Sequence, residues 1–227
     1  MKKLVVLVIV CIISHHFVSA QTQKGSFYFG AIGTASNIFD SENRSNTVTS
    51  TQTMYNFSAG INAGYFIKNN WSLGVTALYN SSLRLTPNTI PSNTENVFWS
   101  APIHLTLHAR RYFMPNPRFG VYGQLRSGIV TGIARNMLRF NGESNLLLSE
   151  ANLTGYSSAL GAGITWFPLK KAKRLNVDVL VNILSYSAIT TDYKDPSTRN
   201  TEINTTFSFF QTSVGLNYYI FKQPDTK

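Results

Sequence analysis

Residues Tyr55 to Ile67, which read YNFSAGINAGYFI, are the clearest indication of the fold class. Its odd-numbered positions carry Tyr, Phe, Ala, Ile, Ala, Tyr and Ile. The positions between them are mostly small or polar: Asn56, Ser58, Gly60, Asn62 and Gly64. Successive side chains of a β-strand point to opposite faces. The stretch therefore predicts a strand with one apolar face and one face of small polar residues.

The same period of two returns in five further stretches, namely 71–79, 97–109, 156–166, 175–183 and 210–220. Weaker alternation over 25–36 and 119–131 completes eight strands. A soluble β-sandwich alternates too, but its wet face is usually rich in Lys and Glu. Here the polar face is mostly Gly, Ser, Asn and Thr, which are small enough to fill a narrow closed barrel.

The connections between these strands alternate in length. Long ones are expected at 37–54, 80–95, 132–152 and 187–204, and short ones at 68–70, 114–117 and 168–173. Long loops on one side and short turns on the other are typical of outer-membrane barrels. The sequence therefore predicts an all-β, eight-stranded antiparallel up-and-down transmembrane β-barrel, with both chain ends on the periplasmic, short-turn side.

Aromatic residues lie near both ends of the expected strands and predict two girdles at the membrane interfaces. Their principal members are Tyr55, Tyr65, Trp71, Tyr79, Trp99, Trp166 and Tyr218, and Tyr112 and Phe167 are assigned to the periplasmic girdle as well. Ten steps of about 3.4 Å from Tyr55 to Tyr65, tilted by about 40°, cross roughly 26 Å. That depth matches the apolar band of such barrels.

The first twenty residues have the layout of a secretory signal peptide. Lys2 and Lys3 precede an apolar run from Leu4 to Ile13, and Val18-Ser19-Ala20 has the form of a cleavage site. The run is too short for a membrane helix. We therefore expect a signal peptide at 1–20, an exported barrel domain at 21–227, and loss of the single cysteine, Cys11, with the signal.

The chain is basic, with 20 Lys and Arg against 10 Asp and Glu, which raises the possibility of nucleic-acid binding. Most of the excess cations, however, fall at the expected periplasmic ends of strands, where they can reach phospholipid head groups. No basic recognition helix is visible. The expected partners are outer-membrane lipids and lipopolysaccharide rather than nucleic acid.

The signal-like start, the segment Gln21–Gly30 (QTQKGSFYFG) and the aromatic segment Ser213–Phe221 carry a resemblance. They resemble the small outer-membrane β-barrels related to the transmembrane domain of outer membrane protein A and to the OmpX and Ail adhesion proteins. The resemblance covers nearly all of 21–227 and lies in architecture and composition. It implies a monomer in the outer membrane of a Gram-negative bacterium, inserted by the barrel-insertion machinery. One departure is the tail Lys222–Lys227, because many members end on the aromatic residue that this machinery reads.

Five ionisable side chains are expected in the lumen as a polar network: His104, His108, Arg110, Arg126 and Asp178. Unpaired charges are costly in a narrow barrel, so we predict that Asp178 pairs with Arg126, with Arg110 nearby. The two histidines would stand about 13 Å apart on one strand and cannot share a metal. The open alternatives for this network are a structural plug, favoured by the narrow lumen, and a gated ion path.

Neither a cofactor, a metal site nor a catalytic site is expected. Some eight-stranded barrels modify lipid A with a Ser-His-acid grouping, but the histidines of this chain face the lumen. Asn141-Gly142, between apolar runs in the stretch Met137–Leu148, predicts a hairpin that projects past the membrane. Pro102, which lacks a ladder donor, predicts a bulge.

The leading functional hypothesis is a structural or adhesin-like surface-interaction protein acting through its outer loops, with a possible extracellular ligand. A narrow channel or small-solute porin is the alternative, and a lipid A-modifying enzyme is the third. The sequence carries no motif that names a ligand.

Overall fold

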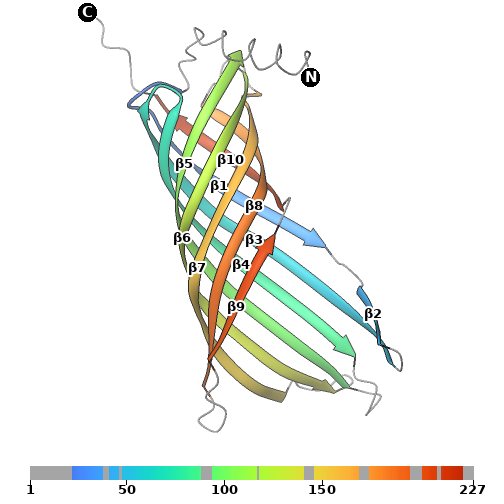
Figure 1. Cartoon of the computed structure of the whole chain (residues 1–227). Helices are drawn as coiled ribbons and strands as arrows, with labels where there is room; N and C mark the ends of the chain where they lie inside the picture. Colours follow the sequence, from blue (N-terminus) through green and yellow to red (C-terminus); the bar gives the residue numbers. More distant parts are fainter. Residues whose placement is uncertain are drawn as a thin grey trace, which may run out of the picture.

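The computed structural model consists almost entirely of antiparallel strands (Figure 1). It describes residues 22–37, 41–45, 48–87, 94–116, 118–140, 146–168, 174–194, 201–208 and 211–221, so the expected signal peptide lies outside the described residues. The strands are β1 (Phe27–Asn37), β2 (Ser41–Ser45), β3 (Val48–Lys68), β4 (Trp71–Pro87), β5 (Thr94–Asn116), β6 (Phe119–Phe140), β7 (Leu146–Trp166), β8 (Leu175–Tyr193), β9 (Thr201–Ser208) and β10 (Gln211–Ile220). Among these residues no helix is both long and apolar enough to cross a membrane.

The strands close into a ring. Neighbours pair in the order β1-β10-β8-β7-β6-β5-β4-β3, and β1 pairs with β3 as well as with β10. β2 continues the ladder of β1 along β3, and β9 continues the ladder of β10 along β8. We count β1 with β2 as one stave of the barrel wall, and β10 with β9 as another, so the ten segments form eight staves. The predicted eight-stranded antiparallel barrel is confirmed.

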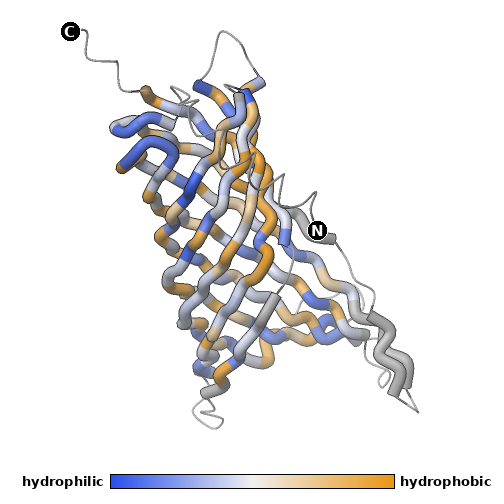
Figure 2. The backbone as a smooth tube through the Cα atoms, turned by 45° about the horizontal axis from the view of Figure 1, so that its top comes forward, coloured by the Kyte–Doolittle hydropathy of each residue, from blue (hydrophilic) through white to orange (hydrophobic). Residues whose placement is uncertain are grey.

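Burial follows the predicted alternation between the two faces of the wall. Along β7, residues 159, 161, 163 and 165 are buried while 160, 162, 164 and 166 are exposed. The outward side chains are large and apolar, and Ile61 and Leu107 are each 68% exposed. Figure 2 shows the resulting alternation of hydropathy along the strands. A surface this apolar is stable in contact with hydrocarbon and would be unusual in water.

The two ends of the barrel differ. The inner end carries the short turn at 69–70 and the short connection from β5 to β6, together with the first and last described residues, 22 and 221. Asn70 adopts a left-handed φ of 66° in its turn, a conformation that Asn tolerates better than most residues. Its backbone N–H donates to the Thr22 carbonyl at 2.8 Å, and Gly25 donates to Phe66 at 2.9 Å, so the N-terminal segment is fixed to this end.

At the outer end the strands run much further than predicted. β5, β6 and β7 contain 23, 22 and 21 residues, whereas about 9–11 suffice to cross a membrane. The described residues of the expected long loops at 37–54, 80–95, 132–152 and 187–204 are therefore almost all strand, which corrects the prediction. The period-two signal needs lipid on one face, so it ends at the membrane edge although backbone pairing continues beyond it.

The predicted hairpin over Met137–Leu148 is confirmed as far as it is described. β6 and β7 stay paired as far as Leu138 and Leu146, while the Asn-Gly turn falls in 141–145, outside the described residues. The predicted bulge at Pro102 is wrong. Pro102 pairs with Gly132, and the β4–β5 ladder skips the pairs between Tyr79–Ile103 and Ser82–Ser100 without a change of register. The missing proline donor interrupts the ladder but does not shift it.

The wall also has a seam in its outer half. β1 pairs with β10 only as far as Gly33 and Val214, and further out its residues 34–37 pair with β3 alone. β9 pairs with β8 and with no other described strand. Figure 1 shows the strands spreading toward the outer end on this side, between β9 and β2.

Candidate functional site in the barrel lumen

The inner half of the lumen is filled by large side chains. Eight of them form one buried cluster: Tyr28, Phe66, Tyr112, Met114, Tyr122, Phe167, Leu180 and Tyr219. Tyr28 and Tyr219 stack with ring centroids 5.4 Å apart, and Tyr112 and Tyr122 lie 5.2 Å apart. Gly64 faces the Tyr28 ring and Gly163 faces the Tyr122 ring so closely that a Cβ would clash. Glycine at these two positions makes the room that the rings occupy. We call this cluster the plug.

Arg110 lies inside the plug, only 2% exposed. Its guanidinium donates to Asp178 Oδ2 at 3.1 Å, to Gln124 Oε1 at 2.5 Å and to the Tyr112 hydroxyl at 3.3 Å. Its Cζ also lies 4.9 Å from the centroid of the Tyr122 ring. A buried guanidinium is tolerated when it is paired and hydrogen-bonded in this way.

Asp178 is held from several strands. Besides Arg110, it accepts hydrogen bonds from Asn217 of β10 at 3.0 Å and from Asn176 at 2.8 Å. The predicted pairing of Asp178 with Arg126 is wrong, because the salt bridge is made to Arg110. Arg126 stands two residues, about 7 Å of strand, further out than Gln124, the ladder partner of Arg110.

The two lumen histidines have separate surroundings. His108 is buried beside the plug, where Nε2 lies 2.7 Å from the Tyr28 hydroxyl and Nδ1 lies 3.1 Å from Thr76 Oγ1. His104 lies further out, with Nδ1 3.3 Å from Ser157 Oγ. No group of three or more His, Cys, Asp or Glu that could hold a metal occurs within the described parts of the chain.

Beyond the plug, the outer half of the lumen is hollow. A cavity of about 760 Å³ lies there, bounded mostly by hydroxyl and amide side chains. Its polar lining includes Asn56, Ser58, Asn80, Ser82, His104, Thr106, Arg126, Ser157, Asn182, Ser187, Gln211 and Ser213. No carboxylate is among the described residues that line it. Thr206, Gln211 and Thr212 bring the cavity to the seam in the wall.

Arg126 is the charged member of this lining. It is partly buried, and no hydrogen bond or ion pair joins it to any side chain in the described ranges. Arg110 and Arg126 both project into the lumen, but only Arg110 is paired with the Asp178 carboxylate among the described residues.

Outside the membrane band, one ionic cluster ties the extended strands together. Glu150 of β7 accepts a hydrogen bond from Arg135 of β6 at 2.7 Å and forms a second, very short ion pair with Lys194, which follows β8. The hydrogen bond from Lys194 lowers the pKa of Glu150 most, and the one from Arg135 lowers it further. The Arg135 guanidinium also lies 5.7 Å from the centroid of the Trp99 ring.

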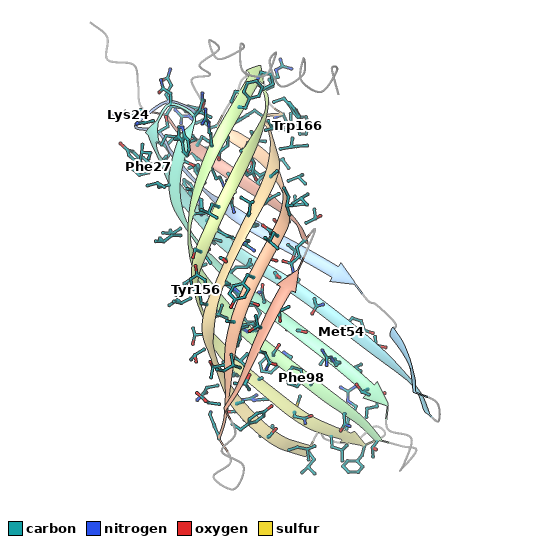
Figure 3. The ribbon with its side chains drawn as sticks, viewed as in Figure 1. Lys24, Phe27, Met54, Phe98, Tyr156 and Trp166 are labelled. Carbon is teal, nitrogen blue, oxygen red and sulfur yellow. The ribbon has the colours of Figure 1, made fainter. Side chains whose placement is uncertain are left out.

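The predicted girdle residues lie on the outward side of the wall. Five of them are exposed, namely Tyr55, Tyr65, Trp71, Tyr79 and Trp166, whereas Trp99 and Tyr218 are partly buried. Figure 3 shows Phe27 and Trp166 projecting from the barrel near its inner end. Tyr112 and Phe167 do not belong with them, because both are buried in the plug.

The plug aromatics could have been found by extending the alternation already used. On β5 the even-numbered residues from His104 to Arg110 face the lumen, so Tyr112 must face it as well. The same count carries Asn217 on to Tyr219. An aromatic residue at a strand end belongs to a girdle only if its side chain points outward. On the inward side of the strand it belongs to the plug.

Comparisons with protein-family models and with curated proteins found no match. Among solved structures, the chain is similar to outer membrane protein W of E. coli, with a TM-score of 0.49 and 15% identity, covering 87% of this chain and 99% of that one. It is also similar to outer membrane protein OprG of Pseudomonas aeruginosa, with a TM-score of 0.43, 14% identity, and coverage of 90% and 100%. The chain is similar to Neisserial surface protein A as well, with a TM-score of 0.34 and 15% identity, covering 86% of this chain and 99% of that one.

Proposed function

We propose that this chain is an integral, non-conducting barrel of the bacterial outer membrane that presents its outer end as a surface-interaction site. The apolar outward faces of all eight staves support a place in lipid. Export by a cleaved signal peptide at 1–20, insertion by the barrel-insertion machinery, a monomeric state and contact with lipopolysaccharide belong to the same proposal.

One observation carries the proposal: the inner half of the lumen is packed, and the outer half is hollow. The rings of the plug pack against one another and around the buried Arg110–Asp178 pair, which supports a closed inner end. Eight-stranded barrels have an interior just wide enough for side chains. A lumen blocked at one end can receive a ligand but does not pass it on.

The protruding ends of β5, β6 and β7 support the surface-interaction role. They extend past the apolar band and end in exposed apolar side chains, namely Phe140, Leu146, Leu147 and Leu148. Exposed apolar groups on a rigid paired sheet are typical of protein-contact surfaces.

Two measurements test this function. In planar bilayers the purified protein should show no large, stable conductance. Cells that display it should adhere to a host-cell or abiotic surface better than cells with an empty vector, and shortening the β6–β7 hairpin by removing residues 138–147 should abolish the gain. A stable conductance would contradict the non-conducting assignment, and unchanged adhesion of the shortened variant would contradict the surface role.

A small-solute channel is the second candidate, and the cavity of about 760 Å³ is the observation that favours it. The channel would require the plug to move aside. Conductance should be measured for the intact protein and for a variant in which Tyr122 and Tyr219 are replaced by Ala. Conductance that appears only in the variant would show that the plug is a fixed seal, and would contradict the channel.

A further inference from the structure

We infer that the outer cavity is a binding site for a small, hydroxyl-rich organic anion, a sugar carboxylate or sugar phosphate, whose charged group is held by Arg126. The inference rests on the proposed function only in that the lumen is closed at its inner end. No experiment on conductance or adhesion decides it.

The described charged side chains give the lumen a net positive charge. The described charged side chains of the plug and the cavity are Arg110, Arg126 and Asp178. Asp178 is committed to Arg110 at 3.1 Å and to the amides of Asn176 and Asn217. One positive charge therefore stays uncompensated, and it is located at Arg126.

Among the described residues, Arg126 lacks a counter-charge in surroundings that make a counter-charge favourable. Arg126 is partly withdrawn from bulk water, and an isolated guanidinium in such surroundings is stabilised by an incoming anion more than an exposed one would be. Its planar fork matches a carboxylate or a phosphate with two parallel hydrogen bonds. An anionic group on the ligand is the chemistry that this side chain selects.

The rest of the cavity lining supplies hydrogen-bonding groups. Ser157, Asn182, Thr106 and His104 line the same cavity as Arg126 and offer both donors and acceptors. The described lining contains no carboxylate that would repel an anion. These hydroxyls and amides complement a body rich in hydroxyl groups, and about 760 Å³ lies within the usual range for small-molecule sites.

The access route also fits. The plug closes the inner side, so a ligand enters from the outer end, where Arg84 lies on the same face of β4 as Ser82. A cation at the mouth raises the local concentration of anions. Binding should therefore weaken as salt is added.

Titration calorimetry of the refolded barrel in a non-ionic detergent tests the site, with glucuronate and glucose 6-phosphate as anionic probes and glucose as the neutral counterpart. Arg126→Gln should weaken the binding of both anions by at least about tenfold, and Arg126→Lys should retain part of it. Arg174→Gln is the matched control, because Arg174 is an exposed arginine at the inner end, and it should bind like the native chain.

Heat-modifiable gel mobility shows that each variant is folded. Anion binding that is lost in Arg126→Gln and kept in Arg174→Gln, with glucose binding much more weakly, supports the site. Equal binding by Arg126→Gln, equal binding of glucose and glucuronate, or no saturable binding of either anion overturns it.

Discussion

The two halves of one lumen treat the same residue type in opposite ways. In the inner half Arg110 is buried, paired with Asp178 and enclosed by aromatic rings; in the outer half Arg126 faces a cavity without a partner. The difference shows that the charge of a lumen side chain does not define its role. A guanidinium enclosed with a carboxylate is part of the packing, whereas one beside open volume is free to select a ligand.

Removal of the Asp178 carboxylate should have the largest effect on stability. Asp178→Ala should lower the free energy of unfolding by about 3–5 kcal/mol, because Arg110 stays buried without its counter-charge. Arg126→Gln should change it by less than about 1 kcal/mol, because no pair is lost. Urea unfolding in lipid vesicles, followed by tryptophan fluorescence, measures both. Similar losses of unfolding free energy in the two variants would contradict the difference between a paired Arg110 and an unpaired Arg126.

A smaller effect comes from the space beneath the plug rings. Gly64→Ala should destabilise the barrel by about 1–3 kcal/mol, because its Cβ would overlap the Tyr28 ring. Gly123→Ala is the matched control on the outward face, where a new Cβ meets nothing within 4 Å. The same unfolding assay should place Gly123→Ala at or slightly above the native chain. Equal stability of the two variants would mean that the ring is not tightly seated.

The smallest effect concerns pH and the outer extension. The pKa of Glu150 is lowered in the folded chain, so its ion pairs contribute stability above the ordinary pKa of 4.5 and lose it as pH falls through the lowered value. Amide hydrogen exchange at the outer ends of β6, β7 and β8 should therefore speed up in acid, and Glu150→Gln should produce the same effect at neutral pH. Protection that does not change with pH in the native chain would argue against this cluster as a tie between strands.

The fold could be predicted because lipid imposes a strict alternation on every stave. Residues 55–67 carry that alternation through the whole membrane depth. Past the membrane edge the alternation ends, as in Leu146-Leu147-Leu148 at the start of β7, so the outer ends of β6, β7 and β8 do not read as strands in the sequence. Their pairing is a property of the backbone, which the side-chain pattern does not record.

The lumen was predicted in part. Alternation placed His104, His108, Arg110, Arg126 and Asp178 inside the wall, but it does not give the relative height of residues on non-adjacent strands. That height depends on the stagger of the closed ring, which moves each strand along its neighbour. For this reason the alternation placed both arginines in the lumen but could not show that Arg110, and not Arg126, pairs with Asp178.

Cysteine accessibility on intact cells distinguishes a lumen that is open outside and sealed inside from one that is open throughout. Ser157 and Thr165 lie on the same face of β7, the first lining the cavity and the second fully buried beside Asn176. The one native cysteine, Cys11, belongs to the segment predicted to be removed. A membrane-impermeant maleimide should label Ser157→Cys readily and Thr165→Cys only after unfolding. Equal labelling of both positions in folded protein would contradict the sealed inner half.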